Sequence, residues 1–172
     1  MPETENEVTE FVLERVFAAP PTTVWRTWTE PNLLARWYKP NAECQTAVLE
    51  HDLRLGGIMR YEMRFGETQF HYEHWEFDLI DPPTRLRWKH SITDVDGNIV
   101  GNPRMPDWPR VMLTTIELEP HPQGTLQRLR WLPHEATDTE IECFRNASAH
   151  LDQGWVAGFN SQAEFLERFD DE

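Results

Sequence analysis

The chain has 172 residues, a length that suits one domain and is short for two. It carries 30 acidic and 16 basic residues, which gives a formal net charge of −14. A field of that sign repels phosphate backbones and anionic lipid, so we expect neither nucleic acid nor a membrane surface as a partner. Eight Trp and nine Phe can supply much of a core without a metal or disulfide staple.

The cysteines and the N-terminal residues indicate a cytoplasmic protein. Cys44 and Cys143 fit neither a zinc spacing nor a disulfide framework, and reduced thiols are typical of the cytosol. The first ten residues, MPETENEVTE, lack the apolar core of a signal peptide. No stretch reaches the ~18 apolar residues of a membrane span. We expect residues 1–8 to be a disordered tail and residues 9–172 to form a single domain.

A strand and two short helices are predicted at the start of this domain. Residues 10–17 mix β-branched and aromatic side chains, which is typical of a strand. Pro20-Pro21 and then Pro31 each mark the start of a helix, because Pro is tolerated in a first turn. The sequence therefore predicts a helical pair over residues 22–37.

Alternating apolar and polar residues predict antiparallel strands between residues 43 and 133. On one of these strands, the alternation places Trp75, Phe77 and Leu79 together on the apolar face. Residues 98–109 have no such pattern and favour an irregular loop over an opening. The expected strands after the first turn at Gly56-Gly57 are 58–65, 70–80, 85–93, 110–119 and 125–132.

A long C-terminal helix is predicted from about residue 138 to residue 169. Thr137-x-x-Glu140 is a capping box, and apolar residues follow it at helical spacing. Gly154 and Gly158 each cost roughly 1 kcal/mol against Ala, so they mark either a close approach to the sheet or a bend. Strands segregated from helices predict an α+β fold, with a six- or seven-stranded antiparallel sheet curled around this helix.

Several segments together resemble one known family. The run RVFAAPPTTVWRTWTEPNLLARWYKP begins at Arg15, DLRLGGIMRYEMR spans 52–64, and DLIDPPTRLRW spans 78–88. With QGT at 123–125 and GW at 154–155, they resemble the START/SRPBCC (birch-pollen-allergen-like) superfamily. The most similar branch is the one named for homologues of the activator of a heat-shock chaperone ATPase. The resemblance covers about residues 9–169, but its motifs are mostly packing and turn residues.

This resemblance implies a helix-grip fold, a seven-stranded sheet wrapped around a C-terminal helix with an internal cavity. Members of the wider superfamily bind lipids, hormones or polyketides, and some are cyclases. The eukaryotic activator carries a separate N-terminal chaperone-binding domain, which we do not recognise in this sequence, so a co-chaperone role is disfavoured. Trp75 stands where the family pattern favours Gly, and its ring is expected to shrink or reshape the cavity.

The candidate ligand-binding residues are those expected to face the interior of such a fold. They form either a plain core or the wall of a cavity, and Met side chains would suit a ligand of variable shape. His90 and Gln127 break the apolar pattern, as satisfied core groups or, with Tyr61, as groups that orient a ligand. The candidates are Met59, Tyr61, Met63, Trp75, Phe77, Trp88, His90, Gln127, Leu129, Trp131, Leu151, Trp155 and Phe159.

The sequence contains no recognisable metal-binding or catalytic motif that would indicate an enzyme. His71 and His74 lie three apart on a strand and point to opposite faces, so we expect exposed histidines, no metal and no cofactor. We find no His-Glu-x-x-His helix, nucleophile elbow or phosphate loop, and assign no catalytic residue. Asp52 and Arg54 are interpreted as a brace around their turn.

The sequence leaves three functions open. The first is a cytoplasmic helix-grip protein that binds a small, mainly apolar molecule in a cavity, alone or as a homodimer. The second is a polyketide cyclase/aromatase-type enzyme that uses a pocket histidine as a general acid or base, with a tyrosine. The third is a chaperone-interacting module. A dry cavity favours the first, convergence of His90, Tyr61 and an acid favours the second, and a filled interior with an exposed apolar patch favours the third.

Overall fold

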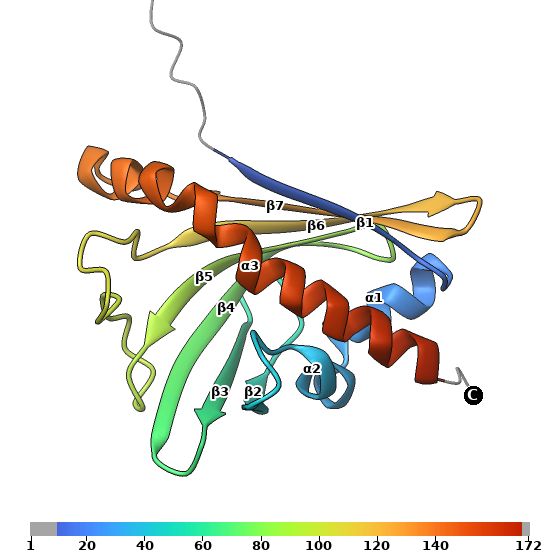
Figure 1. Cartoon of the computed structure of the whole chain (residues 1–172), viewed down its shortest axis with the longest axis horizontal. Coiled ribbons are helices and arrows are strands. Elements are labelled where there is room, and N and C mark those ends of the chain that lie inside the picture. The colour runs from blue at the N-terminus through green and yellow to red at the C-terminus, as the bar shows by residue number, and fades with distance from the viewer. Residues whose placement is uncertain (1–9, 170–172) are drawn as a thin grey trace, which may run out of the picture.

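The computed structural model describes residues 10–169, apart from the side chains of residues 148, 149, 151 and 152. One seven-stranded sheet and three helices make up this part of the chain (Figure 1). The strands are β1 (Phe11–Phe17), β2 (Cys44–His51), β3 (Ile58–Phe65), β4 (Gln69–Asp81), β5 (Arg85–Thr93), β6 (Met112–His121) and β7 (Gly124–Pro133). The helices are α1 (Pro21–Thr29), α2 (Pro31–Trp37) and α3 (Asp138–Arg168).

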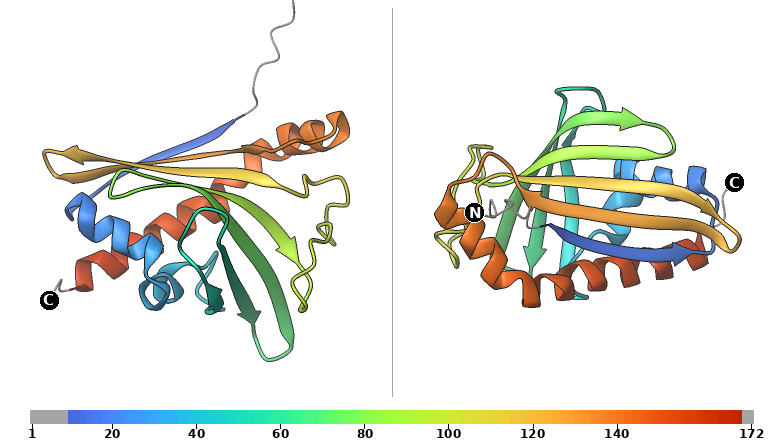
Figure 2. Two further views of the ribbon diagram at one scale, coloured as in Figure 1. Left: turned by 180° about the vertical axis from the view of Figure 1, so that it is seen from behind. Right: turned by 90° about the horizontal axis from the view of Figure 1, so that it is seen from above.

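The sheet is antiparallel throughout, in the order β1-β7-β6-β5-β4-β3-β2. It is strongly curved, and α3 runs across its concave side, while α1 and α2 lie at one end of that side (Figures 1 and 2). Helix α3 contacts β1, β7 and α2. The predicted α+β helix-grip architecture is confirmed.

The two short helices begin where the prolines predict. Pro20 is the extended N-cap of α1, and Glu30, just before Pro31, is that of α2. Trp28 and Trp37 pack edge to face with their ring centres 4.8 Å apart, and Trp37 Nε1 donates to the Thr27 carbonyl at 2.9 Å. The helical pair thereby contributes two buried indole rings to the core on the concave side of the sheet.

The capping box of α3 forms as predicted. Thr137 Oγ1 accepts from the Glu140 backbone N–H, and Glu140 Oε1 accepts from the Thr137 N–H, each at 3.1 Å. A β-carbon added at Gly154 or Gly158 would meet nothing within 4 Å, so neither glycine is required by close packing. Of the two roles predicted for them, the bend remains, and α3 is visibly curved (Figure 1).

The prediction for the inner face of β4 is wrong at Leu79. A bulge between Phe77 and Leu79 shifts the pairing of β4 with β5. Phe77 pairs with buried Trp88, Leu79 pairs with Arg87, and Ile80 takes the inner position opposite Leu86. Strict alternation therefore put Leu79 on the inner face, whereas the extra residue places Ile80 there.

Most of the buried apolar residues that the structure describes fall into two clusters. The larger contains the rings from α1 and α2 together with the inner faces of β3, β4 and β5. The smaller contains Trp108, Met112 and Phe144, with Trp131 packed against it. It joins the loop before β6 to the N-terminal half of α3. The clusters meet where Trp131, packed against the smaller one, contacts Trp155, packed against the larger.

Candidate functional site

The structure brings most of the predicted cavity residues onto the concave face. Trp75 and Trp88 are fully buried and stack with their ring centres 4.0 Å apart. Trp155 reaches the face from α3, with its ring 5.6 Å from Trp131 and 6.3 Å from Tyr38. The side chain of Leu151 lies outside the described residues. The remaining predicted residues are buried there: Met59, Tyr61, Met63, Phe77, His90, Gln127, Leu129 and Phe159.

Gln127 belongs to a closed hydrogen-bond network. Its Oε1 accepts from Trp28 Nε1 at 2.7 Å, and its Nε2 donates to Gln162 Oε1 at 2.9 Å. Gln162 Nε2 in turn donates to Thr27 Oγ1 at 3.0 Å. These polar groups connect α1, β7 and α3. Gln127 is therefore the satisfied core group that the sequence allowed.

His90 belongs to a second network, which contains an acid that the sequence analysis missed. His90 Nε2 donates to Glu73 Oε1 at 2.7 Å, and Tyr61 Oη donates to Glu73 Oε2 at 3.0 Å. His71 Nε2 lies 3.5 Å from Glu73 Oε2. Trp75 Nε1 donates to Tyr61 Oη at 3.3 Å. A single carboxylate thus gathers two imidazoles and a phenol from three adjacent strands.

The charges in this network stabilise one another. Burial by itself would raise the pKa of the Glu73 carboxyl, but the charges and hydrogen bonds of His90 and His71 hold that pKa far below its ordinary value. The hydrogen bond to Glu73 raises the pKa of His71 despite partial burial. Burial, and then the Glu73 charge, raises the pKa of Tyr61. At neutral pH Glu73 is therefore ionised and the Tyr61 hydroxyl keeps its proton.

Four buried polar atoms beside this network have no hydrogen-bond partner within the part of the chain that the structure describes. They are Trp88 Nε1, His90 Nδ1, Thr114 Oγ1 and Trp131 Nε1. Trp88 on β5 pairs with Thr114 on β6, which pairs with Trp131 on β7. The four atoms thus come from neighbouring positions on one face. They lie at the boundary between the two apolar clusters.

A loop anchored on α3 borders this region. Trp108 packs 5.8 Å from Phe144, and the Arg110 backbone N–H donates to Glu140 Oε2 at 2.9 Å. Arg104, in the same loop, acts electrostatically on His71. The segment from 98 to 109 is irregular, as predicted, and it lies close to the outer end of the His90 network.

Comparisons with known proteins agree with this architecture. The profile of the family described as "Activator of Hsp90 ATPase homolog 1-like protein" matches residues 18–167. The chain belongs to this family. Its members share the SRPBCC-type fold that the sequence motifs indicated. No curated protein matches the chain significantly.

Several solved structures share the fold of this chain. A protein from Mycobacterium smegmatis is 21% identical with a TM-score of 0.76, covering 95% of this chain and 93% of its own. One from Chromobacterium violaceum is 26% identical with a TM-score of 0.69, covering 93% and 98%. The AHSA1-like protein from Aeromonas hydrophila is 17% identical with a TM-score of 0.67, covering 92% of each chain.

Sequence reasoning misplaced one residue of the site and missed two others in this family member. It expected His71 to be an exposed strand histidine, whereas His71 faces inward and is paired with Glu73. Glu73 itself was missed, although it lies two residues before Trp75 and so on the same face of β4. Thr114 was also missed, because its importance depends on pairing with Trp88 and Trp131 across two strands.

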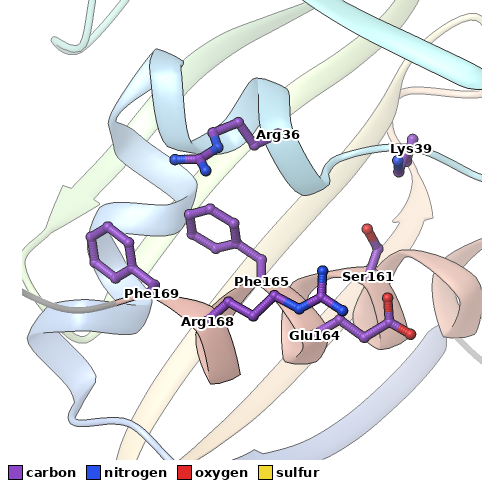
Figure 3. A pocket seen from close by; sticks show the side chains of 7 residues that line it. All are labelled: Arg36, Lys39, Ser161, Glu164, Phe165, Arg168 and Phe169. Atoms are coloured by element: carbon purple, nitrogen blue, oxygen red, sulfur yellow. The ribbon is translucent and has the colours of Figure 1, made fainter.

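Two surface hollows lie away from the predicted cavity residues. One, of about 320 Å³, lies between α2 and the end of α3 (Figure 3). Arg36 lies over the Phe165 ring there, 5.1 Å from its centre, and Lys39 and Arg168 add positive charge. The other, of about 310 Å³, lies between α2 and β2. Neither is lined by a predicted cavity residue, and the internal cavity stays a prediction.

Two further findings concern metal and membrane. Within residues 10–169, no group of three or more His, Cys, Asp and Glu side chains is placed to hold a metal ion. In the same part of the chain, no helix is long and apolar enough to cross a membrane. Arg54 Nε donates to Asp52 Oδ2 at 2.7 Å, which is the brace predicted around the turn before β3.

Proposed function

We propose that this protein binds a small organic molecule between the sheet and α3, at the boundary between the two apolar clusters. The observation that carries the proposal is the row of four unpartnered polar atoms on β5, β6 and β7. Each buried polar group without a partner costs about 1–3 kcal/mol, and folded proteins leave few of them. A bound molecule that offers complementary groups removes this cost.

The surroundings of these atoms suit the apolar body of such a molecule. The Trp75–Trp88 stack borders them on one side, and Trp131 with Trp155 borders them on the other. Small-molecule sites combine apolar and aromatic walls with a few placed polar groups. Apolar probes such as N-phenyl-1-naphthylamine are therefore expected to bind and to quench tryptophan fluorescence.

Replacing Thr114 with Val tests the site through both stability and binding. The change removes an unpartnered hydroxyl at nearly constant shape, so the free energy of unfolding is expected to rise by about 1 kcal/mol. A ligand that bonds this hydroxyl is expected to bind several-fold more weakly. Urea denaturation and fluorescence titration measure the two effects.

Thr125 provides the matched control for this experiment. It is equally buried, but its Oγ1 donates to the Ala19 carbonyl at 2.6 Å. Thr125→Val is expected to lower the free energy of unfolding by about 1 kcal/mol and to leave probe binding unchanged. If no organic probe shows saturable binding to the native protein, the proposal is wrong, and a protein-interaction role becomes the better hypothesis.

A second candidate is an enzyme that moves protons on a bound aromatic precursor, as in the cyclase/aromatase type. The convergence of Tyr61, His90 and Glu73 within 2.7–3.1 Å favours it. Tyr61 would turn its O–H from Glu73 to a developing oxyanion, and His90 would act as the general base through Nδ1. The test is deuterium exchange at the carbon beside the carbonyl of 2-tetralone, followed by NMR. Exchange equal in the native protein and in Tyr61→Phe would rule this candidate out.

A further inference from the structure

Building on the proposed function, we propose that the ligand is an aromatic carboxylate whose carboxylate group is held by the indole N–H groups of Trp88 and Trp131. Thr114 and His90 complete the set of contacts. This assigns a chemical class to the molecule and an orientation within the site.

Hydrogen-bond direction is the first argument. An indole Nε1–H can only donate, so Trp88 and Trp131 require an acceptor. They stand on the two strands that flank β6, each in register with Thr114. Neighbouring strands are about 4.8 Å apart, so the donors straddle the Thr114 hydroxyl. A carboxylate has two oxygens with about four acceptor positions, enough for two N–H groups and one hydroxyl.

Charge is the second argument. The protein as a whole carries −14, yet two imidazoles surround the single Glu73 carboxylate, and Arg104 acts on the same region. Glu73 already accepts from His90 and Tyr61, so its oxygens are engaged. His90 contacts Glu73 through Nε2, and the other nitrogen of its imidazole ring, Nδ1, has no partner among the described residues. A proton on this nitrogen would let His90 donate to a ligand carboxylate in a charge-assisted hydrogen bond, the stronger kind.

The rings around the site supply the third argument. Trp131 lies with its ring centre 5.6 Å from Trp108, 5.6 Å from Trp155 and 5.8 Å from Phe144. Such ring arrays favour an aromatic body through offset and edge contacts, with about 0.5–1.5 kcal/mol per pair beyond area burial. A donor-only group such as an ammonium would meet N–H groups and positive charge instead.

The test compares three probes with one aromatic body: 2-naphthoate, 2-methylnaphthalene and 2-naphthylmethylammonium. Affinities are measured at pH 7 by tryptophan quenching and calorimetry. We expect 2-naphthoate to bind about tenfold more tightly than 2-methylnaphthalene, as two or more charge-assisted bonds would give, and the ammonium to bind most weakly. If the three probes bind equally, the ligand is not a carboxylate, while the proposed function stands. If none binds, both are wrong.

Trp88→Phe and Trp131→Phe test the orientation. Each keeps an aromatic ring and removes one N–H, so each is expected to weaken binding of 2-naphthoate several-fold more than it weakens binding of 2-methylnaphthalene. Trp108→Phe is the matched control, because Trp108 lies beside Trp131 and its N–H is not one of the four unpartnered atoms. Near-ultraviolet circular dichroism verifies that each variant is folded. Naphthoate affinity that is unchanged in both test variants would overturn the assignment.

Discussion

Gln127 and His90 both interrupt an apolar strand face, yet the structure gives them opposite surroundings. Gln127 is completely buried in a neutral network in which Trp28, Gln162 and Thr27 complete the hydrogen bonds. His90 joins a charged network around Glu73, which is 15% exposed, and one of its ring nitrogens has no partner among the described residues. The glutamine network is complete without a ligand, whereas the histidine network is not.

This difference separates a polar group that specifies the fold from one that is available for chemistry. The glutamine network fixes α1 and α3 against β7, and its loss would leave buried amides and an indole unpaired. The histidine network contacts the larger apolar cluster through Tyr61, and its His71 feels the charge of Arg104 in the loop before β6. We therefore expect changes in the first network to alter stability, and changes in the second to alter binding and pH response.

Gln127→Leu is expected to have the largest effect on stability. The change leaves the Trp28 N–H without an acceptor and removes a hydrogen-bond partner of Gln162. The free energy of unfolding should therefore fall by about 3 kcal/mol. Affinity for naphthalene probes should be unchanged in the folded fraction. Chemical denaturation measures the first quantity. A loss below about 1 kcal/mol would show that the network does not hold α1 and α3 against β7.

Glu73→Gln is expected to lower the free energy of unfolding by about 2 kcal/mol at pH 7. The reason is that hydrogen bonds from His90 and His71 to a charged carboxylate are replaced by bonds to a neutral amide. The lowered pKa of Glu73 means that its carboxylate contributes stability above its ordinary value of 4.5, and that this contribution is lost as the pH falls further. The raised pKa of His71 contributes stability below 6.5 that is lost as the pH rises through the raised value.

In Glu73→Gln the free energy of unfolding should therefore depend less on pH, both in the acidic range where Glu73 titrates and in the range where His71 titrates. Urea denaturation from pH 3 to pH 8 gives this curve for both proteins. Glu62→Gln, on the same sheet but outside the network, is the control. Parallel curves for the native protein and Glu73→Gln would contradict the electrostatic coupling between Glu73 and the two histidines.

His90→Gln is expected to have the smallest effect on stability and a clear effect on binding. The Gln amide can still donate to Glu73, so the free energy of unfolding should change by about 1 kcal/mol or less. The variant lacks the second ring nitrogen, Nδ1, so 2-naphthoate should bind about tenfold more weakly. Unaltered naphthoate binding would remove His90 from the proposed contacts.

The sequence predicted the fold well because its signals are local. The prolines before α1 and α2, the capping box of α3, and the alternation on β3 and β5 each depend on neighbouring residues. Leu79 was misplaced because the bulge after Phe77 carries no Gly or Pro to announce it. Local patterns thus determine elements, but not the exact register within them.

The site was predicted only in part because its key relations are between strands. Tyr61 and His90 were identified as polar groups on inner faces, and Glu73 was within reach of the same alternation. The unpartnered state of Trp88 and Trp131 depends on what lies opposite them across β6, and no single segment encodes it. Whether a buried donor is satisfied is a property of the assembled sheet.

The position of β1 in the sheet has a kinetic consequence. This strand pairs with β7, so that Glu14 and Arg128 meet across 114 residues of chain. Closing such a loop costs entropy before its contacts repay it, and non-local strand pairing slows folding. We expect β2 through β7, which pair as successive neighbours, to assemble first and β1 to dock late. Amide exchange should then find β1 opening most readily, although it lies beside the strand that carries Gln127 and Trp131.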